Sequence, residues 1–183
     1  MRAFIAIDLP DDIKLRLEKV IRVLRRSHLR LSLVNPENLH MTLKFLGEID
    51  SEQAVQIGQR LDIIARQQEV FSLSLTDFGF FPPRGTPRVL YVGTNQQQRL
   101  TELARQLDEQ LAPLGFPSTD HFTPHITISR IKDNVVSEQI EILINESFPE
   151  GTFPVSSFAL YCSTLHQRGV HYELLHRPLF SNS

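Results

Sequence analysis

The chain has 183 residues, is 41% hydrophobic and carries a formal net charge of −2 at pH 7. This length suits one large domain or two small lobes that share a core, and the charge excludes a protein that coats long nucleic acids through bulk electrostatics. Cys162 is the single cysteine, which excludes an internal disulfide and a multi-thiolate zinc site and leads us to expect a cytoplasmic location.

The first 50 residues predict a strand, a helix and a second strand. Residues 1–7 form an apolar run that suits a strand and is too short for a signal peptide or a membrane span. Pro10, followed by two aspartates, is typical of a helix start, and apolar residues then recur at helical spacing to about Arg26. A turn at 36–38 leads into the next strand, which ends at Gly47.

The middle of the chain predicts a second helix followed by two strands. Asp50 and Gln53 have the spacing of a capping pair at the start of this helix. Its predicted buried stripe consists of Ala54, Ile57, Leu61 and Ile64. Apolar and polar residues alternate over 71–76, which indicates a half-buried strand, and a proline-rich loop separates it from a further strand at 88–93.

The remainder of the chain repeats this order. A third helix is predicted from the regularly spaced leucines Leu100, Leu103, Leu107 and Leu111. After it we predict one more strand, a helix around 138–144, and a final pair of strands at 155–162 and 170–175. The order of strands and helices in the first half is thus roughly repeated in the second half, with no flexible linker between the two halves. We therefore predict an α+β fold over 1–183, a single domain with two pseudo-symmetric sheet-and-helix lobes and a central cleft.

The most informative feature is a tetrapeptide that occurs twice, as His40-Met41-Thr42-Leu43 and His125-Ile126-Thr127-Ile128. Each copy lies in an apolar run with strand character. Because successive side chains of a strand point to opposite faces, the His and the Thr of each copy share one polar face. By the same alternation, the apolar face of the first copy is expected to hold Met41, Leu43 and Phe45.

This repeat points to phosphoryl-transfer chemistry. Two imidazoles brought together can serve as acid and base, and two hydroxyls can hold an oxyanion, without a metal or a covalent nucleophile. A third triplet, His121-Phe122-Thr123, complicates the choice of register. Because Pro124 follows it and proline cannot donate to a central ladder, we take His121 as a loop residue and His125 as the site residue.

Both tetrapeptides lie within longer segments of recognisable sequence. These segments are Arg-Ala-Phe-Ile-Ala-Ile-Asp at 2–8, Asn-Leu-His-Met-Thr-Leu-Lys-Phe-Leu-Gly-Glu at 38–48, Phe-Thr-Pro-His-Ile-Thr-Ile-Ser-Arg at 122–130 and Ser-Thr-Leu at 163–165. With them the chain resembles the 2H phosphoesterase superfamily, and within it the RNA 2′,3′-cyclic phosphodiesterases of bacteria and archaea, also called LigT-like 2′-5′ RNA ligases. The resemblance implies a bilobal fold with no cofactor and no metal requirement. Ile128-Ser129 stands where many relatives have Leu-Gly, which leaves the His and the Thr unchanged.

The resemblance also implies a reaction and residue roles. His40 would be the proton donor to the leaving 3′ oxygen, His125 the proton acceptor from water, and Thr42 and Thr127 donors to the phosphoryl oxygens. A 2′,3′-cyclic phosphate would open to a 2′-phosphomonoester, and the reverse reaction would join RNA ends through a 2′-5′ linkage. The sequence alone does not distinguish acid from base, because the two motifs are nearly equivalent. We expect a monomer that binds RNA ends carrying a cyclic phosphate, or small cyclic nucleotides, and no membrane.

Supporting residues are open to two interpretations each. Arg130 falls on the opposite face from His125 in a regular strand, so it reaches a phosphate only with a bulge or at the strand's end. Lys44 shares a face with His40 and either adds positive potential or is a solvated strand end. Tyr172 is placed at the cleft by the resemblance. Three aromatic residues can stack bases or belong to the core: Phe78, Phe80 and Phe81. Four histidines have no paired partner in the sequence and are expected at the surface or in the core: His28, His166, His171 and His176.

Three rival functions remain. A metallohydrolase would use His40, His121, His125 and Asp120, but the chain lacks the helical His-x-x-x-His and the acid spacing typical of such sites. A nucleotide- or RNA-binding module of the same fold would keep the cleft without chemistry, although binding alone does not need two titrating groups. A phosphodiesterase of the same superfamily would act on a small cyclic nucleotide.

Overall fold

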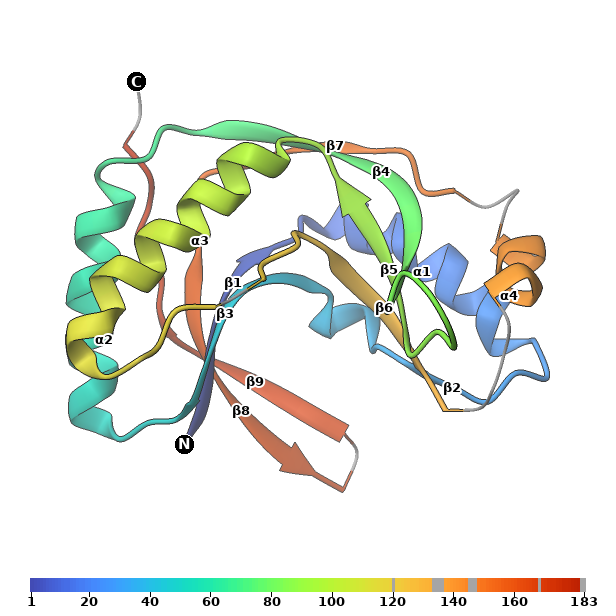
Figure 1. Ribbon diagram of the computed structural model, residues 1–183, viewed down its shortest axis with the longest axis horizontal. Helices are drawn as coiled ribbons and strands as arrows, with labels where there is room; N and C mark the ends of the chain where they lie inside the picture. Colours follow the sequence, from blue (N-terminus) through green and yellow to red (C-terminus); the bar gives the residue numbers. More distant parts are fainter. Residues whose placement is uncertain (120, 133–136, 145–147, 168, 182–183) are drawn as a thin grey trace.

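Two antiparallel sheets form the framework of the protein (Figure 1). The computed structural model describes residues 1–119, 121–132, 137–144, 148–167 and 169–181. The first sheet has the strand order β3 (His40–Glu48), β1 (Arg2–Asp8), β8 (Ala159–His166) and β9 (Gly169–His176). The second has the order β2 (Leu31–Leu33), β6 (Ile126–Ile131), β5 (Val89–Thr94), β4 (Phe71–Phe81) and β7 (Thr152–Val155). Each tetrapeptide therefore belongs to a different sheet.

The helices pack in two pairs at opposite ends of the molecule (Figure 1). Helices α2 (Ser51–Ala65) and α3 (Gln97–Leu111) lie together, and α3 contacts β3 of the first sheet. Helices α1 (Asp11–Arg25) and α4 (Ser137–Ile144) lie together, and α1 contacts β2 of the second sheet. Short 3₁₀ turns occur at η1 (Pro36–Asn38) and η2 (Ala112–Leu114).

The two lobes exchange helices. Helix α1 follows β1 of the first sheet yet packs at the second, and α3 follows β5 of the second sheet yet packs at the first. We call the first lobe the sheet β3-β1-β8-β9 with α2 and α3, and the second lobe the sheet β2-β6-β5-β4-β7 with α1 and α4. The predicted α+β fold with two sheet-and-helix lobes is confirmed, but each lobe draws on both halves of the sequence.

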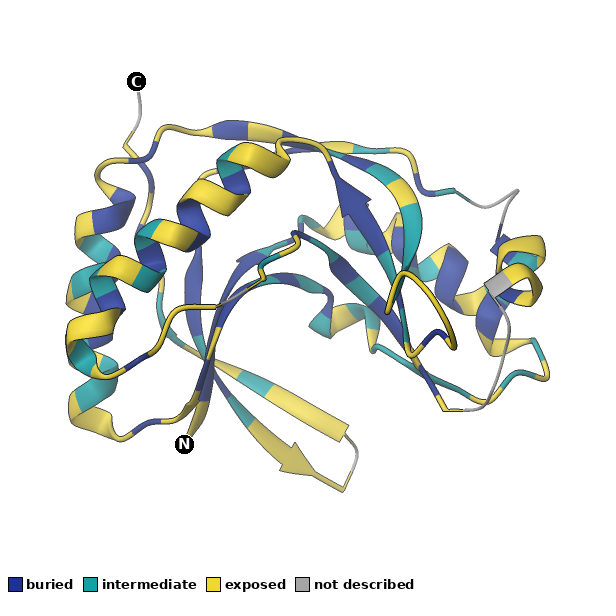
Figure 2. Cartoon of the chain, viewed as in Figure 1, coloured by how far each residue is buried: buried dark blue, intermediate teal, exposed yellow. Residues whose placement is uncertain are grey.

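The helices form where the apolar stripes predict them. Helix α1 begins directly after Pro10, and its first-turn aspartates complement the positive end of the helix dipole. Helix α2 has the capping box predicted from Asp50 and Gln53, in which each residue satisfies a backbone N–H of the other. Helix α3 buries the four predicted leucines. Burial on one face of each helix, visible in Figure 2, supplies the apolar contact with the sheets.

The prediction of one strand over 155–162 is wrong. The chain instead leaves β7 at Val155 and enters β8 at Ala159, and these strands belong to different sheets. Val155 at the end of β7 and Phe158, Ala159 and Leu160 at the start of β8 are all buried, and only Ser156 and Ser157 stand between them. Two serines are too few to distinguish a change of sheet from the polar positions of one alternating strand. The short edge strand β2 was not predicted, because three residues are too few to show alternation.

None of the helices that the structure describes is both long and apolar enough to cross a membrane. The end of β8 and the beginning of β9 are mostly exposed (Figure 2).

Candidate active site

A β-bulge in the first motif strand sets which side chains face the cleft. Strand β1 pairs Ile5 with Lys44 and Ala6 with Thr42, so Leu43 is an extra residue on β3. The bulge reverses the alternation that follows it: Lys44 is buried, with 3% of its surface exposed, whereas Phe45 is 72% exposed. The expectation that Lys44 shares the face of His40 and that Phe45 is buried is therefore wrong.

The second motif strand has a bulge at the equivalent position. Strand β5 pairs Leu90 with Ser129 and Tyr91 with Thr127, which leaves Ile128 as the extra residue. Ser129 is fully buried and Arg130 turns to the face that carries Thr127. The bulge that the sequence required for Arg130 to reach a phosphate is thus present. In both motifs the extra residue is the fourth of the tetrapeptide, so the two strands are related by the same pseudo-symmetry as the lobes.

Buried Lys44 on the first motif strand contacts the segment that precedes the second motif. Its ammonium group pairs with the carboxylate of Asp108 on α3 and donates to the carbonyl oxygen of Pro117 at 2.6 Å. The other carboxylate oxygen of Asp108 accepts the backbone N–H of Thr119 at 2.9 Å. Residues 117–119 lead to the second motif, so this ion pair joins the first motif strand, α3 and the approach to His125.

The two motif strands face one another across a pocket of about 280 Å³. It brings together all five residues singled out from the sequence: His40, Thr42, His125, Thr127 and Arg130. Tyr172 also lines it, as the resemblance implies. Sequence reasoning did not single out the other aromatic residues of this pocket, Phe4 and Phe45.

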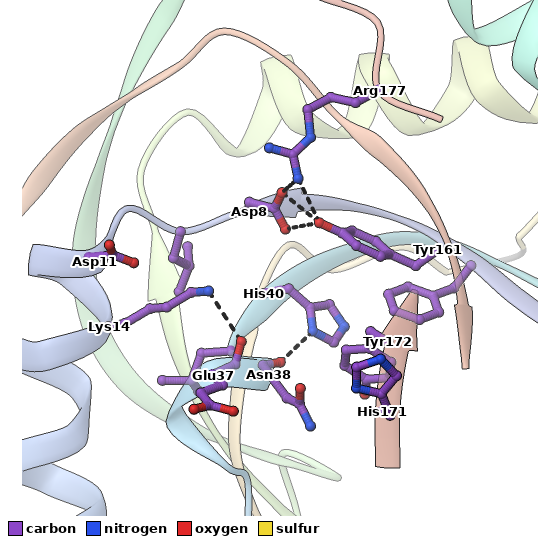
Figure 3. Close-up of a pocket in the computed structure, with 13 residues that line it drawn as sticks. Asp8, Asp11, Lys14, Glu37, Asn38, His40, Tyr161, His171, Tyr172 and Arg177 are labelled. Atoms are coloured by element: carbon purple, nitrogen blue, oxygen red, sulfur yellow. Dashed lines mark hydrogen bonds and ion pairs between the residues drawn. The ribbon is translucent and has the colours of Figure 1, made fainter. Parts of the chain in front are cut away.

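Each imidazole is held by the backbone two residues before it. Nδ1 of His40 lies 2.7 Å from the carbonyl oxygen of Asn38, a bond drawn in Figure 3, and Nδ1 of His125 lies 2.7 Å from that of Thr123. Because a carbonyl oxygen only accepts, Nδ1 must be the donor in both rings. Nε2 is then the atom of each ring that is left to accept or donate a proton in the pocket. In His40 it lies 2.9 Å from the hydroxyl oxygen of Thr42.

Burial lowers the pKa of both imidazoles. Desolvation is the largest effect for His40 and for His125, and the hydrogen bonds to the carbonyls of Asn38 and Thr123 oppose it in part. The pKa of His40 is further raised by the charge of Asp8 and lowered by those of Lys14 and His125. The neutral form of each ring is therefore favoured at neutral pH. A bound phosphate, being negative, would favour protonation of one ring.

Aromatic rings support both imidazoles. The ring centroid of His40 lies 4.9 Å from that of Phe4 and 5.3 Å from that of Tyr172. His125 has edge-on contacts with Phe81 at 4.9 Å and Tyr91 at 5.5 Å. Of the three phenylalanines considered for base stacking, Phe81 thus contacts a site residue. Phe78 contacts Phe148, and both Phe78 and Phe80 pack against the core.

The structure separates the remaining histidines from the paired motifs. Three are exposed outside the pocket of the motifs: His28, His121 and His166. His176 bonds Asp62, and His171 lines a neighbouring pocket described below. One ligand of the metallohydrolase alternative, Asp120, lies outside the described residues. Among the residues that are described, no group of three or more His, Cys, Asp or Glu side chains is arranged to hold a metal ion.

Comparison with known proteins places this geometry in a family. The family described as LigT-like phosphoesterases matches residues 7–91 and 92–172. The chain belongs to this family. It is 35% identical to a protein named RNA 2′,3′-cyclic phosphodiesterase from Thermotoga maritima, over 98% of this chain and 96% of the relative. A protein of the same name from Archaeoglobus fulgidus is also 35% identical, over 94% of this chain and 97% of the relative.

Solved structures of LigT-like phosphoesterases have the same fold. The crystal structure of Escherichia coli LigT complexed with 3′-AMP superposes with a TM-score of 0.76 at 30% identity and covers 98% of both chains. The resemblance predicted from the sequence is therefore confirmed. Each segment matched by the LigT-like family contains one tetrapeptide, although the two segments do not coincide with the two lobes.

Proposed function

We propose that the protein is an RNA 2′,3′-cyclic phosphodiesterase that opens a terminal 2′,3′-cyclic phosphate to a 2′-phosphomonoester. The observation that carries this proposal is the convergence of His40 and His125, one from each lobe, on a single pocket with two threonine hydroxyls and the guanidinium of Arg130. Binding alone would not need two titrating groups in one pocket. The names of the full-length relatives support the same substrate class.

In this reaction the two imidazoles move protons in opposite directions. Water attacks phosphorus and gives its proton to Nε2 of His125, while the bond from phosphorus to the 3′ oxygen breaks and that oxygen takes a proton from Nε2 of His40. The assignment of donor and acceptor rests on the family resemblance. One proton has then moved from His40 to His125 through the substrate, and exchange with solvent restores the starting state.

Charge on the phosphoryl oxygens is stabilised by fixed donors. The hydroxyls of Thr42 and Thr127 lie on the same strands as the imidazoles, so they approach the phosphate from both lobes. Arg130, turned to the cleft by its bulge, supplies a permanent positive charge. If an RNA 5′-hydroxyl takes the place of water, the same chemistry forms a 2′-5′ linkage without a nucleotide cofactor. We further propose that the enzyme acts as a monomer in the cytoplasm.

The decisive experiment assays an RNA ending in a 2′,3′-cyclic phosphate beside free 2′,3′-cyclic nucleotides, with a metal chelator present. Phosphorus NMR then assigns the product. We expect a 2′-phosphomonoester and activity that survives chelation. A 3′-phosphate product would contradict the assignment of the leaving oxygen, and complete loss with chelator, restored by added metal, would favour the metallohydrolase. Hydrolysis of free cyclic nucleotides alone would restrict the substrate to small molecules.

A further inference from the structure

The cleft face of the second sheet continues beyond the residues of the candidate active site. Val89 of β5 pairs with Arg130 of β6 and with Phe81 of β4, and Tyr91 of β5 pairs with Thr127 of β6. Directly paired residues of neighbouring strands lie on the same face of a sheet. Phe81 and Tyr91 therefore share the face of Arg130 and Thr127, so two aromatic side chains lie in the cleft next to the second motif.

The two lobes carry an aromatic ring at equivalent positions of this register. In the first sheet, Phe4 of β1 pairs with Phe45 of β3 and with Tyr161 of β8. Phe45 and Arg130 each lie two residues after the extra residue of their bulge. Phe81 in the second sheet therefore corresponds to Tyr161 in the first. The aromatic surface beside the second motif is thus the counterpart of the one beside the first motif.

Phe81 and Tyr91 form a flat surface against the imidazole of the second motif. Their ring centroids lie 4.4 Å apart with an angle of 24° between the planes, and both rings meet His125 edge-on. Both side chains are half-buried. Aromatic rings of this kind can stack any nucleobase, because every base has a π face.

The direction of the reaction places the attacking group on this side. In phosphoryl transfer the attacking and leaving oxygens are roughly in line on opposite sides of phosphorus. Because the proposed function activates water at His125 and protonates the leaving 3′ oxygen at His40, a group that replaces water approaches from the side of His125. This step rests on the proposed function.

The 5′-hydroxyl of a second RNA strand is such a group. Its oxygen attacks phosphorus and its proton passes to Nε2 of His125, while the bond from phosphorus to the 3′ oxygen breaks and that oxygen takes a proton from Nε2 of His40. The product is a 2′-5′ phosphodiester with a free 3′-hydroxyl, and no water is consumed. The first nucleoside of the second strand then lies beside His125.

The loop that follows Phe81 carries positive charge. Arg84 and Arg88 are exposed in this loop, which joins β4 to β5 (Figure 2). The backbone N–H of Arg88 donates to the carbonyl oxygen of Phe81 at 2.7 Å, so the loop closes directly beside that residue. Neither guanidinium forms an ion pair with an acidic residue in the described part of the chain. Because the first phosphates of a strand lie within one or two nucleotides of its 5′-hydroxyl, these cations suit the strand that continues from the stacked nucleoside.

The side of His40 has the opposite balance of charge. A cavity of about 440 Å³ adjoins His40 there (Figure 3). Three acidic and two basic residues line it: Asp8, Asp11, Glu37, Lys14 and Arg177. The phosphates of a second strand are therefore attracted to the loop of the second lobe and not to this cavity.

We propose that the cleft face of β4 and β5 beside His125 binds the 5′-hydroxyl end of a second RNA strand. Phe81 and Tyr91 stack the first base of this strand. Arg84 and Arg88 hold its first phosphates. We call these four residues the acceptor site.

The test measures how the enzyme divides a cyclic phosphate between water and an acceptor. The donor is 5′-O-methyladenosine 2′,3′-cyclic phosphate, which cannot serve as its own acceptor because its 5′ oxygen is blocked. The acceptors are the 5′-hydroxyl trinucleotide ApApA and the same trinucleotide with an abasic 1-deoxyribose as its first residue. At acceptor concentrations below saturation, the ratio of 2′-5′ linked product to hydrolysis product compares the two attacking groups in the same complex.

We expect this ratio to be about fivefold or more higher for ApApA than for the abasic acceptor. Phe81→Leu, which removes the ring, should abolish most of the difference. Any effect of Phe81→Leu on His125 cancels in the ratio, because water and the acceptor give their protons to the same imidazole.

The salt dependence of the ratio tests the two arginines. The logarithm of the ratio for ApApA should fall with the logarithm of salt concentration with a slope of about −1.4, since each of two phosphates contributes about −0.7 in a single strand. Arg84→Gln combined with Arg88→Gln should bring this slope close to zero. Arg25→Gln, which changes an exposed arginine on α1 of the same lobe, is the matched control and should leave the slope unchanged.

Three results would each overturn the acceptor site while leaving the proposed reaction intact. They are hydrolysis of the donor without any 2′-5′ product, equal ratios for the two acceptors, and a salt slope that survives the double arginine change. If the donor is not hydrolysed, the proposed reaction fails instead. Calorimetry on protein saturated with 2′-AMP then tests the acceptor site without catalysis. Tighter binding of ApApA than of the abasic trinucleotide, lost in Phe81→Leu, would support the site, and equal binding would refute it.

Discussion

The buried ion pair behind the site gives a stability prediction that follows directly from the structure. The side chain of Lys44 is 2% exposed and that of Asp108 is 15% exposed. Asp108→Asn keeps the size of the side chain and an oxygen that can accept from Thr119, but it leaves the ammonium of Lys44 with only the carbonyl of Pro117. A buried charge that loses its partner cannot regain water, so the folded state bears most of the cost.

We expect Asp108→Asn to lower the free energy of unfolding by about 3–5 kcal/mol, the usual cost of removing one partner of a buried pair. For a chain of this length each kcal/mol corresponds to about 2–4 °C in Tm, so Tm should fall by roughly 6–20 °C. Thermal unfolding followed by circular dichroism measures the change, with denaturant unfolding as an independent check of the free energy.

A matched control is the exposed pair of Glu102 and Arg105 on the same helix, whose side chains are about half exposed. Glu102→Gln should leave Tm unchanged because water replaces the lost partner. The double change Lys44→Met with Asp108→Leu should be less destabilising than Asp108→Asn alone, since apolar replacement of a buried pair leaves no unpaired charge. If Asp108→Asn melts within about 2 °C of the wild type, the reasoning that water is excluded from Lys44 is wrong.

Three further predictions concern catalysis. His40→Ala and His125→Ala should each lower kcat by about two to four orders of magnitude in a steady-state assay. The loss of kcat in the double variant should be smaller than the product of the two single losses. His121→Ala should keep kcat within a few-fold of the wild-type value. The pH profile of kcat/KM should pass through a maximum and fall on both sides of it, because the active state carries one proton between the two imidazoles. The maximum should lie below the ordinary histidine pKa of about 6.5, because burial lowers the pKa of both rings. A profile that falls on one side only, with chemistry rate-limiting, would exclude paired acid–base catalysis. Arg130→Met should lower kcat/KM by about 10²–10³, since it removes a positive charge from the pocket that would hold the phosphate, and an unchanged rate would show that its bulge does not deliver it to the phosphate.

Local patterns in the sequence determined the helices and identified the residues of the candidate site. The stripes of α1, α2 and α3 repeat every three to four residues, so burial on one face follows from the sequence wherever a partner surface exists. The capping box at Asp50 likewise involves residues only three apart. The two tetrapeptides could be paired because their His and Thr are two residues apart, which gives one face in any regular strand.

Only the tertiary structure decided which residues next to the tetrapeptides face the cleft. A bulge is a property of two paired strands, and the sequence of β3 alone does not show that β1 skips Leu43. Because of that skip, Lys44 is buried and Phe45 is exposed, the reverse of regular alternation. The equivalent skip at Ile128 brings Arg130 to the pocket that holds both motifs. The exchange of α1 and α3 between lobes and the change of sheet between β7 and β8 also depend on contacts between segments far apart in the chain. Short-range periodicity carries no information about such contacts, because the same apolar residue is buried equally well against either sheet.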